Sequence, residues 1–194
     1  MFDNSSVAPI DTDRGLLRAA RQVQSPNHDE RPAGVVMDLI VVHGISLPPD
    51  EFGGPWIDCL FTNTLPAAEH PYFAQIADRK VSSHLLIRRD GELVQYVPFN
   101  RRAWHAGVSQ YRGRERCNDF SIGIELEGTD TSAYEPAQYR ALAHTIAALC
   151  DAYDSLSVER IAGHSDVAPG RKTDPGESFD WPRLRALLAF LGSR

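Results

Sequence analysis

The sequence DFSIGIELEG, residues 119–128, alternates apolar side chains with polar or small ones through its central part. In an extended strand, successive side chains point to opposite faces. One face therefore carries Ile122, Ile124 and Leu126, and the other carries Gly123, Glu125 and Glu127. This pattern predicts a central strand that buries its apolar face and turns its two carboxylates towards solvent or into a cleft.

Three further stretches predict strands that accompany it. Residues 35–44, VVMDLIVVHG, form a β-branched apolar run that is typical of a buried strand and ends in a histidine and a glycine. Residues 82–98, SSHLLIRRDGELVQYVP, place an Asp-Gly pair between two apolar runs, which predicts a hairpin. Residues 158–164, VERIAGH, predict a short strand that also ends in a histidine. Residues 16–23, LLRAARQV, fit an edge strand or a short helix, and the pattern does not decide between them.

Two amphipathic helices are expected in the C-terminal part of the chain. Apolar residues recur at steps of three and four between residues 136 and 153, and a proline opens this segment. A second pattern of this kind, at residues 184–191, predicts a final helix. The sum is an α/β fold: one domain, residues 1–194, with a mixed central sheet of about five or six strands flanked by helices. Residues 1–15 are expected to form a loose leader.

The composition argues against several classes of partner. The formal net charge of −6 argues against general nucleic-acid binding, which needs a concentrated basic face. No apolar run approaches the roughly 20 residues of a membrane-spanning helix, and the first residues lack the pattern of a secretory signal. Three cysteines without paired spacing indicate reduced thiols, buried as small apolar side chains. We therefore expect a cytoplasmic protein without an obligate protein partner.

Residues 162–176, AGHSDVAPGRKTDPG, contain too many prolines and glycines for a helix, yet they carry His164, Lys172 and Asp174. His43 and His164 each follow an apolar strand directly, so they converge if the two strands lie near each other. Asp174 can reach the same point from its loop. Two imidazoles and one carboxylate, with a fourth position left to water, form the ligand set of a catalytic zinc site. Spacing alone leaves an alternative open, because a histidine at a strand end is often only a hydrogen-bonded boundary residue.

The polar face of the strand at 119–128 offers a general base. Glu125 or Glu127 would serve beside a metal-bound water if it lay within hydrogen-bond reach of it. Alternatively, both carboxylates are ordinary solvated side chains on the surface of the strand. The alternation does not indicate which of the two would act as the base. Lys172, two residues before Asp174, is either an ordinary surface lysine or a cation that stabilises an oxyanion.

Four blocks of the sequence resemble a known family. They are VVHGISLPPDEFGGPWID (41–58), SSHLLIRRDGELVQYVP (82–98), RAWHAGVSQYRGRERCNDFSIGIELEG (102–128) and GHSDVAPGRKTDPGESFDW (163–181). These blocks are similar to the AmpD-type cytosolic zinc amidases, the 1,6-anhydro-N-acetylmuramyl-L-alanine amidases of bacterial cell-wall recycling. Phage lysozyme-type amidases and peptidoglycan recognition proteins are broader relatives that share the scaffold. The resemblance implies their fold, a mixed sheet flanked by helices.

The resemblance also implies a role for each chemically active residue. The implied ligands of one zinc ion are His43, His164 and Asp174. Glu125, rather than Glu127, is the implied general base, and Lys172 is the implied partner of the negative charge that develops during the reaction.

The same resemblance points to a substrate groove. The residues on the groove-lining blocks are Trp104, Arg116 and Asn118. One position departs from the family pattern, because asparagine is expected after the first zinc histidine and this chain has Gly44. The departure removes a substrate hydrogen bond from that side chain and leaves the metal site intact. His84 and His105 receive no role.

The implied activity is zinc-dependent hydrolysis of the amide bond between the lactyl group of N-acetylmuramic acid and L-alanine in 1,6-anhydro-muropeptides, in cytosolic peptidoglycan recycling. The main alternative is a non-catalytic muropeptide-binding module, which is expected to lack a complete metal set. A structural protein with incidental histidines predicts no bound metal. An amidase that acts on intact cell wall outside the cytoplasm requires export.

Overall fold

A computed structural model describes residues 9–192 of the chain, and its centre is a six-stranded sheet with the order β12-β5-β11-β6-β7-β3. In that order the strands are Ile161–Gly163, Leu39–Ile45, Ser121–Glu127, Leu85–Ile87, Leu93–Gln95 and Arg21–Gln22. The first four strands run parallel, β7 is antiparallel to β6, and β3 is parallel to β7. The predicted mixed sheet is confirmed, and β11 is its central parallel strand.

The N-terminal part is more ordered than a loose leader. β1 (Ile10–Asp11) and β2 (Leu16–Leu17) form a short antiparallel ladder within the segment where the leader was expected. Residues 1–8 lie outside the described part of the chain. The open choice at residues 16–23 resolves in favour of an edge strand, because β3 pairs with β7.

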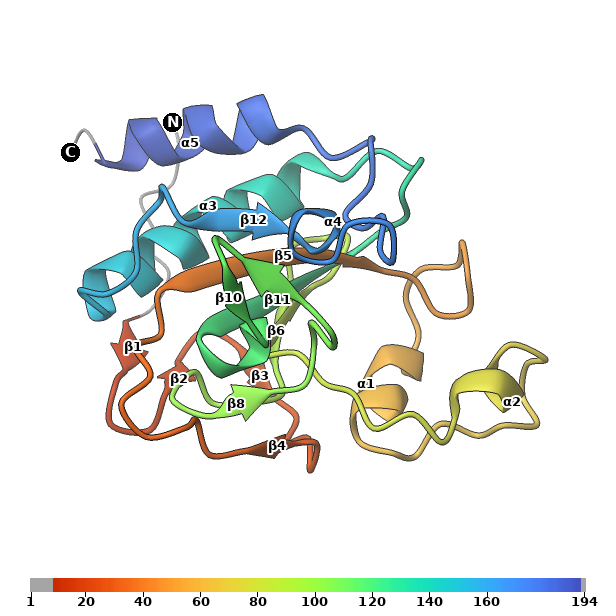
Figure 1. The fold of residues 1–194 in the computed structure, drawn as a ribbon. Helices are drawn as coiled ribbons and strands as arrows, with labels where there is room; N and C mark the ends of the chain where they lie inside the picture. Colours follow the sequence, from red (N-terminus) through yellow and green to blue (C-terminus); the bar gives the residue numbers. More distant parts are fainter. Residues whose placement is uncertain (1–8, 193–194) are drawn as a thin grey trace.

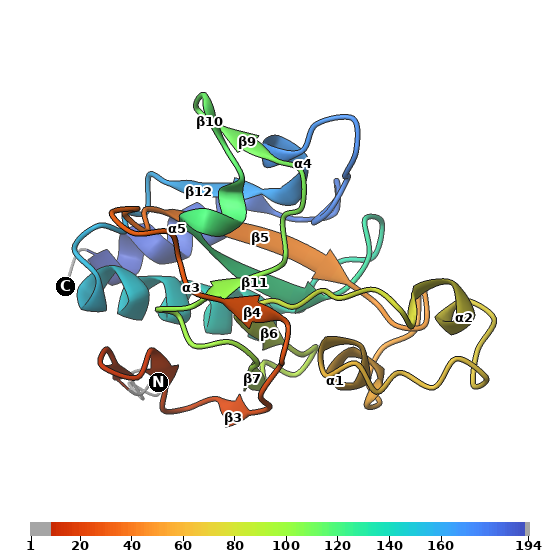
Figure 2. The ribbon, with the colours of Figure 1, turned by 60° about the horizontal axis from the view of Figure 1, so that its bottom comes forward.

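Two more antiparallel ladders lie outside the main sheet. β4 (His28–Asp29) pairs with β8 (Arg102–Ala103). β9 (Gln110–Tyr111) pairs with β10 (Arg114–Glu115), a hairpin that rises above the strand ends in Figure 2. These ladders hold the connection that carries residues 104–109 towards the sheet.

Helices α3 and α5 pack together over one face of the sheet (Figure 1). Their bounds are Pro136–Ala152 and Trp181–Gly192. The apolar face of β11, formed by Ile122, Ile124 and Leu126, is fully buried in the same cluster as Leu142 and Ile146 of α3. Each such aliphatic side chain contributes about 1.5–3 kcal/mol by leaving water. Both predicted helices are confirmed. None of the helices within residues 9–192 is long and apolar enough to cross a membrane.

The opposite face of the sheet carries two apolar clusters and a row of polar side chains. One cluster joins β6 and β7 to α1 (Trp56–Phe61) and α2 (Phe73–Ile76), which lie beyond the end of β5 (Figures 1 and 2). The other packs β5 and β12 against the 3₁₀ turn η1 (Cys117–Asp119). The buried polar row follows β11 and its neighbours, with the members His43, His84, Ser121, Glu125 and Glu127.

The segment at 162–176 contains a short helix, whereas the sequence predicted none. The helix α4 (His164–Val167) follows β12 directly. The Gly163 amide donates a hydrogen bond to Asp166 Oδ2 at 2.7 Å, which caps the turn locally. The prolines of the segment lie after this turn, so they do not interrupt it.

The cysteines are free, as predicted for reduced thiols. Cys117 is fully buried. Cys59 and Cys150 are partly buried and pack against the apolar clusters. All three therefore act as small apolar side chains in the core or at its margin.

Glu127 anchors the long segment at 45–66 to the sheet. It is 1% exposed, and its carboxylate accepts hydrogen bonds from the Gly53 amide at 2.6 Å and from Arg88 Nη1 at 3.2 Å. Arg88 also contacts Asp58 of α1 at 3.4 Å, so the network ties both the loop and the helix to β11. Glu127 also lines a cavity of about 700 Å³, so it faces a cleft, and this network shields it from open solvent.

Replacing Glu127 by alanine would leave the Arg88 guanidinium without its closest carboxylate and the Gly53 amide without a partner. We expect the free energy of unfolding to fall by about 3–5 kcal/mol, the usual cost of breaking a buried ion pair from one side. Urea denaturation of Glu127→Ala measures this loss. The control is Glu92→Ala, which removes a more exposed partner of Arg88 at 4.0 Å and is expected to cost at most about 1 kcal/mol. Equal losses of unfolding free energy in the two variants would show that Glu127 does not anchor the segment.

Candidate active site

The register of three parallel strands brings the candidate residues together. Glu125 of β11 lies opposite His43 of β5. Gly163 of β12 lies opposite Val42, so His164 follows at the next level of the sheet. The carboxyl ends of β11, β5 and β12 therefore deliver one carboxylate and two imidazoles to the same edge.

The structure groups His43, His164 and Asp174 as a possible metal-binding set, with one ligand atom from each lying within 4.8 Å of the others. The two Nδ1 atoms are 2.9 Å apart. Asp174 Oδ2 lies 3.2 Å from His43 Nδ1 and 3.0 Å from His164 Nδ1. Two nitrogens and one carboxylate oxygen that converge in this way match the protein ligands of a catalytic zinc ion.

The charge states of this group suit metal binding. Burial is the main reason that the pKa of His43 falls to about 4, so this imidazole is neutral near pH 7. Burial works in the other direction on Asp174, but the facing imidazoles of His164 and His43 hold the pKa of that carboxyl well below its usual range. A metal needs deprotonated ligands, and both side chains present them at neutral pH.

Asp174 is held in place by the backbone of its own loop and by a tyrosine. The Ser165 amide donates to the Asp174 carbonyl at 2.9 Å, which folds the loop back onto α4. The Tyr134 hydroxyl is buried and donates to the Pro175 carbonyl at 2.8 Å. Gly176 has φ +86° and packs against the backbone of Asp130 so closely that no side chain fits there. These contacts fix the candidate ligand Asp174 from both sides.

Gly44, where the family resemblance led us to expect asparagine, lies against the side chain of Tyr134. A Cβ atom at position 44 would overlap the Tyr134 hydroxyl and would lie 3.4 Å from Pro175 Cα. A side chain here would force the Tyr134 hydroxyl, which reaches the loop of Asp174, to move. Glycine at position 44 therefore leaves room for a hydroxyl that supports the loop of a candidate metal ligand.

Glu125 faces a cavity of about 260 Å³ that the three candidate ligands and Lys172 also line. The residue is 7% exposed. Burial, and next the charge of Asp174, raise the pKa of Glu125 to about 8, while Lys172 opposes the shift. A carboxyl group with a raised pKa in a cavity of this kind is suited to proton transfer.

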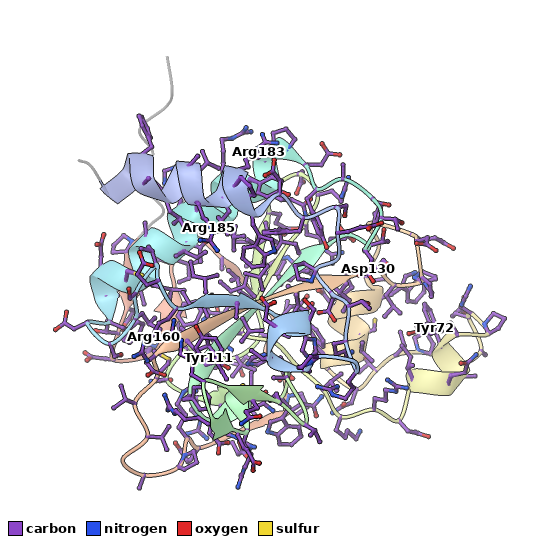
Figure 3. All side chains as sticks on the ribbon, turned by 45° about the horizontal axis from the view of Figure 1, so that its top comes forward. Tyr72, Tyr111, Asp130, Arg160, Arg183 and Arg185 are labelled. Atoms are coloured by element: carbon purple, nitrogen blue, oxygen red, sulfur yellow. The ribbon has the colours of Figure 1, made fainter. Side chains whose placement is uncertain are left out.

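The cavity has one apolar wall and one mixed wall. The apolar wall comes from the 45–66 segment and α2, with Leu47, Leu60, Phe61, Tyr72 and Ile76. Figure 3 shows Tyr72 beside α2 at the edge of the molecule. Trp104 lies on the mixed wall, and its contact with substrate stays a prediction. The long segment at 45–66 therefore borders the cavity directly.

Arg79 also lines this cavity, and sequence reasoning missed it. It lies just after α2, in an exposed stretch without a periodic pattern or motif that would single it out. Within residues 9–192 its guanidinium has no ion-pair partner. It therefore adds an available positive charge to the cavity, beside that of Lys172.

Arg116 and Asn118 lie on a neighbouring cavity of about 710 Å³ and not on the cavity of the metal ligands. The Arg116 side chain is 70% exposed and pairs with Asp119 at 3.3 Å. Asn118 is buried, and its Oδ1 accepts hydrogen bonds from the amides of His105 at 3.2 Å and Ala106 at 2.7 Å. Their contacts with substrate stay predictions, and Asn118 has a clear structural task.

Fold and site together define an α/β protein that presents a metal-ligand group and a buried carboxylate in one cavity, as metal-dependent hydrolases do. The chain belongs to the N-acetylmuramoyl-L-alanine amidase family (Amidase_2), whose family model matches residues 33–177. The family resemblance predicted from the sequence blocks is thereby confirmed.

Similar proteins include several named 1,6-anhydro-N-acetylmuramyl-L-alanine amidase AmpD. The one from Escherichia coli K12 is 62% identical over 177 residues, which cover 91% of this chain and 96% of that protein. The one from Haemophilus influenzae is 50% identical and covers 89% of this chain and 94% of its own length.

Solved structures of related proteins have the same fold. A crystal structure of a selenomethionine derivative of AmpD has 63% identity and a TM-score of 0.88, covering 91% of this chain and 98% of the other. The amidase AmiD of E. coli, solved with the substrate anhydro-N-acetylmuramic acid-L-Ala-D-γ-Glu-L-Lys, has 28% identity and a TM-score of 0.58. That match covers 88% of this chain and 61% of AmiD.

The steric link between Gly44 and Tyr134 predicts a coupled pair of substitutions. Gly44→Ala alone is expected to lower the free energy of unfolding by about 1–3 kcal/mol, because it overpacks against the hydroxyl. In a Tyr134→Phe background the added methyl group has room, so the same change is expected to cost at least about 1 kcal/mol less. Chemical denaturation of the wild type, both single variants and the double variant gives the coupling energy. Additive losses would show that the hydroxyl does not exclude a side chain at position 44.

Proposed function

We propose that this chain is a zinc-dependent amidase that hydrolyses the amide bond between the lactyl group of N-acetylmuramic acid and L-alanine in 1,6-anhydro-muropeptides. We assign the reaction to peptidoglycan recycling in the cytoplasm. The observation that carries the proposal is one cavity lined by the candidate ligands, Glu125 and Lys172. Further support comes from AmpD proteins that match 91% of the chain at 62% identity, and from AmiD, a more distant relative solved with an anhydro-muropeptide.

One zinc ion per chain fits the donor set. His43 and His164 would bind it through Nδ1, and Asp174 through Oδ2, because these atoms face one another. Two imidazoles and a carboxylate favour zinc among the common divalent metals. When bound, zinc supplies a Lewis acid that polarises the amide carbonyl and lowers the pKa of a water molecule.

Glu125 is the proposed general base and, later, the general acid. Its carboxylate accepts a proton from the attacking water and returns that proton to the L-alanine nitrogen as the C–N bond breaks. Burial, and next the charge of Asp174, raise the pKa of Glu125 to about 8 although Lys172 lowers it, and a metal cation beside Glu125 would further favour the ionised form that accepts the proton. A pKa near neutrality serves both directions of the transfer.

Lys172 is the proposed stabiliser of the negative charge on the former carbonyl oxygen. It lines the same cavity as Glu125, and its loop is fixed by the bond from its own amide to the Ala168 carbonyl at 3.1 Å. An ammonium group held near the developing oxyanion lowers the barrier without itself changing protonation.

The walls of the cavity suit the two halves of an anhydro-muropeptide. Leu60, Phe61 and Trp104 offer apolar and aromatic surface to the sugar. Arg79 offers positive charge to the carboxylates of the peptide. Arg116 and Asn118 would contact a substrate only where it extends into the neighbouring cavity.

The non-catalytic binding module remains the second reading of the sequence, and the composition of the cavity argues against it. A domain that only holds muropeptides needs neither a complete ligand set nor a buried carboxyl group with its pKa raised to about 8. Both features cost stability, so their presence together favours catalysis.

The direct test is hydrolysis of a 1,6-anhydro-muropeptide by purified protein, loaded with zinc or treated with a chelator, with the released L-alanine-headed peptide quantified. We expect cleavage that disappears on chelation and returns with zinc. A muropeptide with a reducing N-acetylmuramic acid measures the preference for the anhydro sugar. Zinc-loaded protein that binds the muropeptide without cleaving it would support the binding module instead.

Two substitutions separate the chemistry from metal binding. Glu125→Gln is expected to abolish turnover, because an amide cannot accept the proton of water. Lys172→Ala is expected to slow turnover by about 10²–10³-fold, as for loss of one oxyanion stabiliser. Zinc content, measured by atomic absorption, is expected to equal that of the wild type in both variants. Full activity of either variant would remove that residue from the mechanism.

A further inference from the structure

A chain of hydrogen bonds runs from the candidate ligand His43 into the interior. His43 Nε2 lies 2.9 Å from His105 Nδ1, on the side of the ring away from the other ligands. His105 Nε2 lies 3.2 Å from Ser121 Oγ. Ser121 Oγ donates to the Cys117 carbonyl at 2.5 Å. The chain therefore links a metal ligand to the backbone through two side chains.

The last member fixes the direction of every bond in the chain. A backbone carbonyl only accepts, so the Ser121 proton is committed to Cys117 and the serine oxygen is left to accept from His105 Nε2–H. A neutral imidazole carries one proton, so His105 Nδ1 must then accept from His43 Nε2–H. His43 Nδ1 is consequently unprotonated, and this is the atom that faces the other two ligands.

The surrounding residues are shaped to hold His105 in this place. Gly123 of β11 lies beneath the ring, where a Cβ atom would come within 2.5 Å of His105 Cγ. Asn118 fixes the backbone, because its Oδ1 accepts from the His105 and Ala106 amides. The missing side chain of Gly123 and the hydrogen bonds of Asn118 do not depend on the hydrogen-bond chain. Both favour the same position of the His105 ring.

We propose that His105 is a positioning residue that fixes the tautomer of His43, so that Nδ1 is presented to the metal, and that Ser121 sets the direction of this control. The inference rests on the proposed zinc site. Outer partners of ligating histidines typically account for 10–100-fold in metal affinity. His105 thereby gains a role that no pattern in the sequence assigned to it.

Two measurements on His105→Phe test the proposal, since phenylalanine keeps a planar ring and removes the acceptor. Long-range ¹H–¹⁵N spectra of the histidine rings report the tautomer directly in metal-free protein. We expect His43 to carry its proton on Nε2 in the wild type and to shift towards Nδ1–H in the variant. Zinc affinity, measured by competition with a chromophoric chelator, is expected to fall by about 10–100-fold.

Two matched serine variants distinguish loss of the hydrogen-bond chain from a general loss of packing. Ser121→Ala removes the acceptor of the chain and is expected to weaken zinc binding. Ser83→Ala is the control, because the Ser83 hydroxyl is equally buried and donates to the Gly123 carbonyl at 2.8 Å without joining the chain. We expect its zinc affinity to stay within twofold of the wild type.

The outcomes distinguish this inference from the proposed function. A wild-type His43 with its proton on Nδ1, or an unchanged zinc affinity in folded His105→Phe, would overturn the role of His105 while leaving an active zinc amidase. Protein that binds zinc tightly and uses the predicted tautomer but cleaves no muropeptide would overturn the proposed substrate and keep this inference. Urea denaturation of the metal-free variants confirms that each one is folded.

Discussion

Parallel strands in register place their residues at common levels, and the pairing of β12, β5 and β11 does this for the whole site. His43 and Glu125 face each other in the ladder, and His164 follows at the end of β12. A slip by one residue would turn these side chains to the face that α3 and α5 cover. The slip is prevented because the aliphatic side chains of β11 fill the core beneath those helices. Hydrophobic packing on one face of a strand thus fixes the chemistry on the other.

Local pattern was sufficient for β11, the hairpin and both long helices, since each is specified by its own periodicity. The convergence of His43 and His164 depended on which strands are neighbours, and no local pattern specifies that. The choice between Glu125 and Glu127 was also beyond alternation, because the two positions differ only once Arg88, which follows β6, pairs with Glu127. The family resemblance supplied this choice, and Glu125 as the general base stays a prediction. The short helix that begins at His164 was not predicted, because its segment is rich in proline and glycine. It forms because the side chain of Asp166 accepts a hydrogen bond from the Gly163 amide and caps the helix locally.

Alternate residues on the polar face of β11 have different roles. Ser121 ends the hydrogen-bond chain from the candidate ligand His43, Gly123 leaves room for the ring of His105, and Glu125 opens into the cavity. Glu127 closes the face by anchoring the loop of the apolar wall. Ser121 and Glu127 are hydrogen-bonded although buried, which is the condition for a low-dielectric interior to strengthen such groups. A site built in this way is preorganised, because its side chains need little rearrangement when substrate enters.

The contact between Gly44 and Tyr134 joins two distant parts of the chain. The space beside the first histidine is shared by a strand residue and a hydroxyl that arrives from a loop 90 positions later. Because the hydroxyl also supports the loop of Asp174, a side chain added at position 44 would disturb that loop as well as the strand. The two positions are therefore coupled: a change at one alters the space or the support available at the other, although they lie on different elements of the fold.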